Sequence, residues 1–266
     1  MNALDHSSGK MYWIMTAAIT VIIAVSFISS PPVSDATSSS STVPGGLMVP
    51  LYSYPGATWR NLILAKQSNP TVPVVAVINP NNGPGGSKDP NFVKGIKNLQ
   101  AAGITVLGYV DTNYARVSEN SVKSQVSRYK TWYGVNGIFF DCMWNQKGDE
   151  IYYSTVSNYA HSLGLKMTVG NPGTSIAASY IGTVNILVIY ESSGYPSVSY
   201  LAHTTSGHSK SNFAFIAYSV GKPSSTYVTS TLKYVSWMYI TNAGGSNPYN
   251  SLPSYLSTLM HELTLG

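Results

Sequence analysis

The sequence predicts an α/β protein whose main part is a single (β/α)8 barrel of the TIM type. From residue 46 onward, short apolar runs alternate with longer amphipathic stretches, eight of each. This part is about 220 residues long, which one α/β barrel can account for without a second domain. Three of the ten carboxylates, Asp111, Asp141 and Glu191, end strand-like runs. Barrels build their sites from residues at the carboxyl ends of their strands.

The apolar runs place the expected strands at 46–52, 72–79, 104–111, 136–141, 165–170, 185–191, 212–219 and 235–241. Helical stretches lie between and after them, near 58–68, 89–102, 118–132, 149–163, 174–182, 197–205, 225–234 and 252–263. Strands that alternate with helices imply a parallel sheet joined by right-handed crossovers. Eight such units match a closed barrel, and a doubly wound open sheet is the alternative.

Several helix ends are visible in the sequence. Asp89 and Ser118 stand where an N-cap is needed, and Pro90 occupies the first turn of the helix that follows Asp89. Gly103 and Gly164 follow two helical stretches, at the position where a left-handed C-cap favours glycine. These residues fix the ends of three expected helices.

The glycine-rich segment 81–86 follows a strand, as a phosphate-binding loop would. It does not fit G-x-G-x-x-G, and it lacks the Lys-Ser/Thr of a P-loop. We interpret it as a tight loop, which leaves the doubly wound alternative without a nucleotide fingerprint and leaves no cofactor to expect.

The segment 12–29 contains no charged residue and has the length of a short membrane-spanning helix. Lys10 precedes it, which favours a cytoplasmic N-terminus over 1–11. We therefore expect a hydrophobic helix over 12–29 that acts as an uncleaved signal anchor, with a cleaved signal peptide as the alternative. The Ser/Pro-rich stretch 30–44 is typical of a tether. The barrel, 45–266, is then expected outside the cell, membrane-anchored at the surface or secreted.

The composition narrows the possible partners. The net charge is +5, but the basic residues are scattered, so nucleic-acid binding is disfavoured. The five histidines lack the spacing of metal ligands, and no metal site is expected. The single cysteine, Cys142, excludes an intrachain disulfide, and we expect a small buried side chain there rather than a nucleophile. The barrel is expected to be a monomer.

Asp141 and Glu191 are the expected catalytic pair. Cleavage of a glycosidic bond typically needs two carboxyl groups that face a polyhydroxylated substrate. Aromatic rings with polar edges suit the half-wet surface of a sugar cleft. For Asp111 a helix N-cap is the alternative role. The residues expected to bind substrate are Asp111, Tyr52, Tyr54, Tyr109, Asn79, Trp144, Asn171 and Trp237.

Several blocks of the sequence resemble the spherulin-4-like family, also called spherulation-specific family 4. They are 49–55, 77–85, 108–114, 129–141, 171–174 and the strand that ends in Glu191. The resemblance implies a (β/α)8 barrel. It also implies kinship with fungal glycoside hydrolases that degrade galactosaminogalactan, an exopolysaccharide containing N-acetylgalactosamine.

Fungal members of that family carry an Asp-Glu pair at the end of strand four and a further Glu at the end of strand six. Here Asp141 and Glu191 match the first and the last of these acids, whereas Cys142 stands where the second is expected. A thiol is a much weaker acid and hydrogen-bond acceptor than a carboxylate. The expected function is therefore an exported glycoside hydrolase acting on an amino-sugar polysaccharide. The alternatives are a carbohydrate-binding or envelope barrel that has lost an acid, and a purely structural surface barrel.

Overall fold

The computed structural model describes residues 45–265. The expected cytoplasmic segment 1–11, hydrophobic helix 12–29 and tether 30–44 lie outside the described residues. Among residues 45–265, none of the helices is both long enough and apolar enough to cross a membrane.

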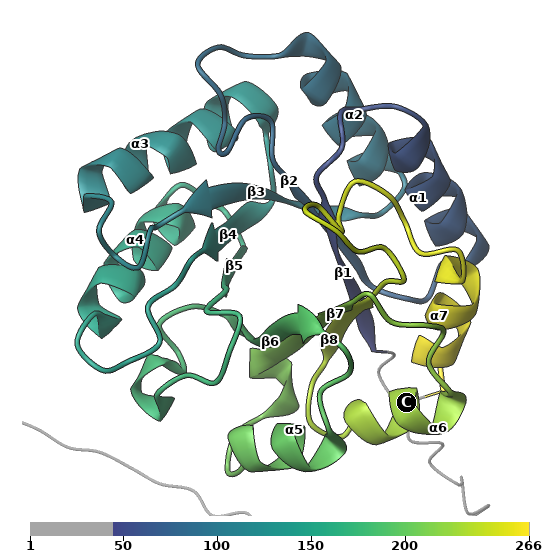
Figure 1. Ribbon diagram of the computed structural model, residues 1–266. Coiled ribbons are helices and arrows are strands. Elements are labelled where there is room, and N and C mark those ends of the chain that lie inside the picture. The colour runs from purple at the N-terminus through teal and green to yellow at the C-terminus, as the bar shows by residue number, and fades with distance from the viewer. Residues whose placement is uncertain (1–44, 266) are drawn as a thin grey trace, which may run out of the picture. The chain divides into compact units, whose positions relative to one another are not determined.

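Eight parallel strands close into a barrel in which each strand pairs with its neighbours in chain order, and β8 pairs with β1 (Figure 1). The (β/α)8 prediction is thus confirmed. The strands are β1 Gly46–Leu51, β2 Val74–Ile78, β3 Thr105–Asp111, β4 Gly137–Asp141, β5 Met167–Gly170, β6 Ile186–Ser193, β7 Phe213–Tyr218 and β8 Trp237–Ile240. Their apolar side chains are almost all buried, since the helices cover the outside of the barrel and the inward side chains fill it.

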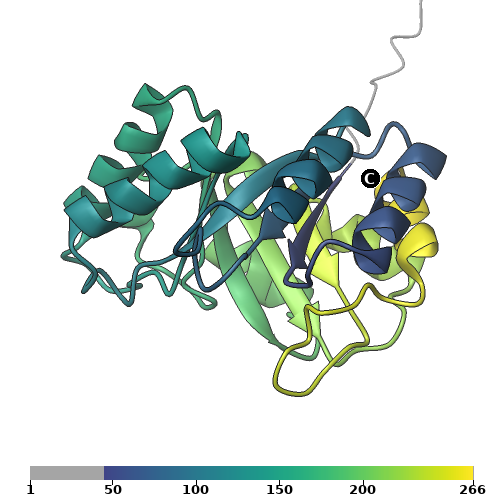
Figure 2. The same ribbon diagram turned by 90° about the horizontal axis from the view of Figure 1, so that it is seen from above.

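The helices surround the barrel, as Figures 1 and 2 show from two directions. They are α1 Ala57–Ser68, α2 Pro90–Ala101, α3 Glu119–Arg128, α4 Glu150–Ser162, α5 Val198–Thr204, α6 Ser225–Thr231 and α7 Leu256–Leu263. A π-helical turn, Tyr129–Tyr133, continues α3, and its first ring lies over Gly108 of β3. A Cβ atom at Gly108 would be 2.5 Å from that ring, so the contact requires glycine.

The prediction of a helix over 174–182 is wrong. Only the short 3-10 turn Ala178–Tyr180 forms there. The backbone before it pairs with the loop after β4: the Ala177 N–H donates to the Asn145 carbonyl, and the Asn145 amide donates to the Ser175 carbonyl. Because these groups bond across to another loop, they are not free to form helical hydrogen bonds with one another.

The expected helix caps are present. The Asp89 carboxylate accepts from the N–H groups of Asn91 and Phe92, at 2.7 and 3.4 Å, and so caps α2. Gly103 and Gly164 both adopt φ of +79° after α2 and α4. The start of α2 and the ends of α2 and α4 therefore lie where the sequence indicates.

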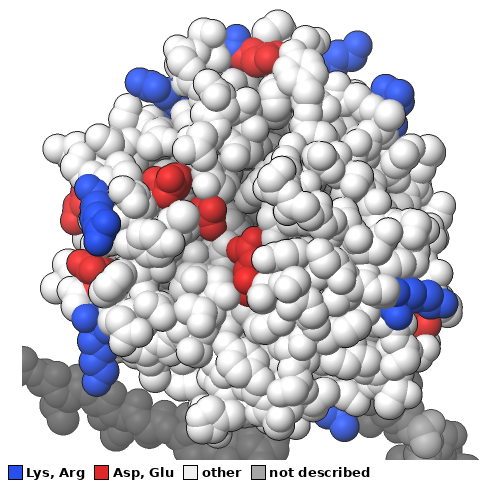
Figure 3. All heavy atoms as spheres, in the orientation of Figure 1, with Lys and Arg blue, Asp and Glu red and all other residues white. Residues whose placement is uncertain are grey.

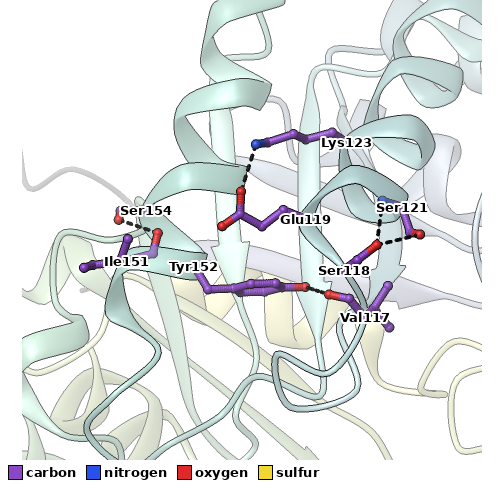
Figure 4. A network of polar contacts seen from close by, with 8 residues as sticks. All are labelled: Val117, Ser118, Glu119, Ser121, Lys123, Ile151, Tyr152 and Ser154. Atoms are coloured by element: carbon purple, nitrogen blue, oxygen red, sulfur yellow. Dashed lines mark hydrogen bonds and ion pairs between the residues drawn. The ribbon is translucent and has the colours of Figure 1, made fainter.

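The start of α3 is held against α4 on the outside of the barrel (Figure 4). Ser118 accepts from the Ser121 N–H, and the Lys123 ammonium lies 2.9 Å from Glu119 one turn away. From α4, the Tyr152 hydroxyl donates to the Val117 carbonyl at 2.7 Å. This network fixes the far end of the loop that leaves β3.

The expectation that Trp237 lies on the substrate-binding rim is wrong. Trp237 is the first residue of β8 and pairs with Gly46, the first residue of β1. In a parallel barrel the first residues of the strands lie at the amino end, opposite the mouth at their carboxyl ends. Its ring packs on Gly46, where an added Cβ would come within 2.3 Å of it. Trp237 is therefore a packing residue at the closed end.

Candidate active site

One amide side chain joins the two expected catalytic carboxylates. Asp141 ends β4, Glu191 lies near the end of β6, and Asn171 directly follows β5 between them. The Asn171 Nδ2 donates to Asp141 Oδ1 at 2.7 Å and to Glu191 Oε2 at 2.5 Å. Both bonds start from one nitrogen, so the two acceptor oxygens are no further apart than the sum of these lengths, about 5.2 Å. The carboxylates thus face each other at one end of the barrel.

The orientation of the Asn171 amide follows from its other partners. Its Oδ1 accepts from the Gly173 N–H at 2.9 Å, so its Nδ2 must face the carboxylates. Its backbone N–H donates to the Phe140 carbonyl at 2.8 Å, and its side chain is only 5% exposed. Asn171 is therefore held rigidly in the one orientation that provides donors to both acids.

A bulge in β6 orients Glu191. The pairing with β7 shifts between Val188 and Glu191, which pair with Ala214 and Ile216. An extra residue in one strand changes the direction of the side chains that follow it. The Glu191 N–H leaves the ladder and donates to the Gly173 carbonyl at 2.9 Å, which ties the acid to the loop that follows Asn171.

Tyr249 is a site residue that the sequence analysis missed. It lies in the loop 241–255 between β8 and α7, drawn in yellow in Figures 1 and 2, and its hydroxyl donates to Glu191 Oε1. The loop is attached to β1 because the Tyr52 N–H donates to the Tyr249 carbonyl at 3.1 Å. The signal that could have found Tyr249 is the length of this loop, since loops at the carboxyl ends of strands build barrel sites.

Tyrosine rings form the wall beside the two acids. Tyr52 meets Tyr109 and Tyr249 edge to face, with ring centroids 5.6 and 5.5 Å apart. Burial raises the pKa of Tyr109 and of Tyr249 far above the usual range of tyrosine. The second cause is the charge of Asp141 for Tyr109 and the charge of Glu191 for Tyr249, so both hydroxyls stay neutral donors.

The pKa values of both acids are raised, but by different sets of groups. Burial is the main cause for each. The negative charge of Asp141 is the second cause of the raised pKa of Glu191. For Asp141 the next effects act the other way, because hydrogen bonds from Tyr109, the Cys142 backbone and Asn171 lower its pKa. Hydrogen bonds from Tyr249 and Asn171 likewise act to lower the pKa of Glu191, so for both acids burial outweighs the hydrogen bonds.

A cavity of about 210 Å³ opens onto the two acids, and its wall includes Tyr114, Cys142 and Asn171. Cys142 is half-buried, not a fully buried packing residue as expected, and has φ of +48°. Burial, followed by the charges of Asp141 and Asp111, raises the pKa of the Cys142 thiol to about 12. A neutral thiol therefore lines the cavity beside the two acids.

Asp111 ends β3 beside Asp141, and its Oδ1 accepts from the Asn113 N–H at 2.7 Å. It shapes a turn and does not cap a helix, since Ser118 is the N-cap of α3. Trp144 is not part of the cavity wall, but its ring meets that of Tyr114, with the two centroids 6.5 Å apart.

Tyr54 and Asn79 are not brought to the cavity wall. The Tyr54 hydroxyl donates to Asp89 and accepts from Asn91, on the outer side of the mouth. The Asn79 side chain accepts from the Gly83 N–H at 2.9 Å and shapes the glycine-rich loop.

Charge is unevenly distributed over the mouth. Figure 3 shows acidic side chains around the hollow in the middle of the face, whereas lysine and arginine lie at its edge. Asp141 and Glu191 belong to the wall of the cavity, whose lining contains neither lysine nor arginine. In the part of the chain that the structure describes, no three His, Cys, Asp or Glu side chains are grouped as metal ligands.

Fold and site together define a (β/α)8 barrel protein with a pair of half-buried carboxylates at its mouth, an arrangement typical of carbohydrate-active barrels. The family model of spherulation-specific family 4 matches residues 46–263. The chain belongs to this family. Spherulin-4 of Physarum polycephalum is 34% identical over 234 residues, which cover 82% of this chain and 70% of that protein.

Solved structures share the barrel. The crystal structure of Aspergillus clavatus Sph3 in complex with GalNAc has a TM-score of 0.76 and 23% identity, covering 83% of this chain and 98% of that one. The spore cortex-lytic enzyme SleL of Bacillus cereus has a TM-score of 0.53 and 11% identity, covering 82% and 74%. At these identities the likeness is one of fold.

Proposed function

We propose that this protein is an exported glycoside hydrolase that cleaves an N-acetylgalactosamine-containing polysaccharide with Asp141 and Glu191. The observation that carries the proposal is the pair of half-buried carboxylates whose facing oxygens are held within about 5.2 Å of each other by one amide nitrogen. Membership of spherulation-specific family 4, and the GalNAc bound to Sph3 of the same fold, support the choice of sugar.

The separation of the acids favours retention of configuration. Retaining glycosidases hold their two carboxyl groups roughly 5–5.5 Å apart, and inverting ones roughly 6.5–9.5 Å, because a water molecule must fit between acid and sugar. An upper bound of about 5.2 Å between the facing oxygens matches the retaining arrangement.

We assign the nucleophile to Asp141, because its charge is one cause of the raised pKa of Glu191. Glu191 ionises against the charge of Asp141 and keeps its proton to a higher pH, so it acts as the general acid. In the first step Asp141 attacks the anomeric carbon, the glycosidic C–O bond breaks, and the Glu191 proton moves to the departing oxygen.

The second step releases the sugar from its ester with Asp141. The Glu191 carboxylate removes a proton from a water molecule, whose oxygen attacks the anomeric carbon, and the C–O bond to Asp141 breaks. This returns Glu191 protonated and Asp141 ionised. Asn171 and Tyr249 donate to the acids in the free enzyme, and so hold them in position for both steps.

A non-catalytic carbohydrate-binding barrel is the second candidate, and Cys142 is the observation that favours it. The residue lines the cavity as a neutral thiol, where fungal relatives carry a carboxylic acid. The proposed mechanism does not use a third acid, but a substrate that needs one would bind without turnover.

We also propose that residues 12–29 anchor the protein in the membrane with the barrel at the cell surface, on the uncharged stretch and Lys10 before it. Membrane fractionation of the full chain tests this. Recovery of intact, uncleaved protein in the soluble fraction would contradict the anchor.

Product release from a panel of amino-sugar polymers by the full chain tests the activity. We expect cleavage of N-acetylgalactosamine polymers by the native protein and loss of cleavage, with binding kept, in Asp141→Asn. Binding without cleavage by the native protein, together with some turnover in Cys142→Glu, would establish the binding barrel instead. Cleavage that survives Asp141→Asn unchanged would eliminate both.

A further inference from the structure

We propose that Tyr114 and Trp144 form a binding site for the sugar next to the one held between the carboxylates. Tyr114 lies in the loop after β3, and Trp144 in the loop after the neighbouring strand β4. Their rings meet edge to face, with centroids 6.5 Å apart and planes at 82°. This site rests on the proposed function and deepens it, because it makes the substrate a chain of sugars and not a single one.

Tyr114 connects this aromatic pair to the catalytic centre. It lines the same cavity as Asp141 and Glu191, but Tyr114 is 46% exposed whereas the two acids are half-buried. The cavity of about 210 Å³ is smaller than the roughly 300 Å³ at which pockets for larger ligands begin. It has room for about one sugar ring, and Tyr114, an exposed residue of its wall, is placed to contact the next sugar of a longer chain.

The chemistry of the pair suits a pyranose. One face of a pyranose ring presents C–H groups, and its edge presents hydroxyls that stay in water. An exposed aromatic ring with a polar edge can cover the C–H face without removing the hydroxyls from solvent. The Tyr114 and Trp144 rings, which come from the loops after two adjacent strands and meet edge to face, present such a surface beside the cavity.

The backbone holds Tyr114 in a conformation that a large side chain rarely adopts. Asn113, Tyr114 and Ala115 have φ of 43°, 57° and 63°, three consecutive left-handed residues. Non-glycine residues in this region are strained, and such strain is concentrated at functional sites. Glycine would relieve it at position 114 if packing were the only requirement. The presence of tyrosine therefore indicates that its exposed ring is needed.

Specific hydrogen bonds keep this strained turn in place. The Tyr114 N–H donates to the Cys142 carbonyl at 2.7 Å, and the Asn113 N–H donates to Asp111 at the same distance. On the other side, the Trp144 N–H donates to the Tyr153 hydroxyl at 2.8 Å. Both backbones are thus fixed, so the two rings form a preformed surface.

A pair of glycine substitutions in one turn tests the site. Tyr114→Gly and Ala115→Gly both relieve a left-handed residue, but only the first removes a ring. Each is made in the full chain carrying Asp141→Asn, and binding of the mono- and tetrasaccharide of N-acetylgalactosamine is measured by calorimetry. We expect Tyr114→Gly to weaken tetrasaccharide binding about tenfold, with monosaccharide binding and melting temperature preserved. Ala115→Gly should leave both affinities unchanged.

Three further variants keep the test independent of folding. Tyr114→Asn keeps a residue that tolerates the left-handed region, and Trp144→Ala removes the second ring. Both should reproduce the selective loss of tetrasaccharide affinity, and Tyr114→Phe should retain it. Equal tetrasaccharide binding by the Tyr114→Gly and Ala115→Gly proteins, or no tetrasaccharide binding by the parent, would overturn the site.

The same set of proteins separates this site from the proposed reaction. If the chain with Asp141 restored binds the tetrasaccharide but does not cleave it, and Tyr114→Gly weakens that binding, the hydrolase proposal fails and the sugar site stands. If Tyr114→Gly binds and cleaves like Ala115→Gly, the site fails and the hydrolase stands.

Discussion

The two acids of the mouth are held in different ways. On the side of Asp141, the ends of β3 and β4 are joined by Thr112, a fully buried residue whose hydroxyl donates to the carbonyls of Asp141 and Cys142. On the side of Glu191, a bulged strand provides the acid, and a long loop provides its Tyr249 donor. One acid is therefore part of the folded barrel, whereas the environment of the other depends on a loop. Changes in the buried contacts that join β3 and β4 should mainly affect stability, and changes in the loop that holds Glu191 should mainly affect catalysis.

Glu191→Gln should produce the largest loss of activity. Glutamine keeps the shape and the contact with Asn171 but cannot transfer a proton, and general acid–base assistance contributes roughly 10²–10⁴-fold. We expect kcat to fall within that range while polymer binding is retained, measured by reducing-sugar release and by calorimetry. A kcat within twofold of the native value would remove Glu191 from the mechanism.

Asn171→Ala should produce the next largest loss, because it removes the donor shared by both acids. Without Nδ2, the pKa of each acid should rise further, and the two groups lose the contact that sets their spacing. We expect kcat to fall about 10²-fold, with the whole pH–rate profile displaced to higher pH. Asn79→Ala is the matched control, since it also removes an amide oxygen that accepts from a glycine N–H, but away from the cavity.

Tyr249→Phe should change the Glu191 side alone. The hydroxyl stabilises the ionised form of Glu191, so its removal raises the pKa of that acid. A general acid works while protonated, so the alkaline limb of the pH–rate profile should move to higher pH. We expect kcat near neutral pH to change about tenfold or less and the melting temperature to stay constant. An alkaline limb that does not move would assign the acid to another residue.

Removing a charge from the site should stabilise the fold at neutral pH. Burial raises the pKa of Asp141 and Glu191 in the folded state, so folding is favoured when they are protonated. That stability is full below their unfolded pKa values, near 4, and is lost as the pH rises through the raised folded values. Asp141→Asn should therefore raise the melting temperature at about pH 7 and leave it unchanged at about pH 4. A melting temperature that rises at about pH 4 but not at about pH 7 would mean that other titratable groups determine how stability depends on pH.

Thr112→Val should affect stability more than catalysis, and it is the smallest change expected in kcat. The variant leaves two backbone carbonyls and the Tyr153 hydroxyl without their shared partner. We expect a loss of about 2 kcal/mol in the free energy of unfolding, measured by denaturant titration. If stability were unchanged while kcat fell, the contrast between the two sides of the mouth would be wrong.

The fold and part of the site could be predicted because their signals are local. Each strand is a short apolar run, and Asp141 and Glu191 are conspicuous because they end such runs in a chain with 9% charged residues. Tyr249 could not be found in this way, since it lies in a loop and reaches Glu191 58 positions away in sequence. Trp237 was misplaced because residue type does not show at which end of its strand a residue lies. The segment 174–182 looked helical because its hydrogen bonds to the loop after β4 are not visible in sequence.

Cys142 gives the protein a built-in chemical reporter. It is the sole cysteine of the chain, and it lines the cavity beside both acids. Thiol reagents react with the thiolate, so at neutral pH a group with a pKa of about 12 is modified slowly, at a rate set by its surroundings. Occupation of the cavity by a sugar, or a change in the charge of Asp141, must alter that rate. Alkylation of the unmodified protein therefore measures ligand occupancy without any introduced label.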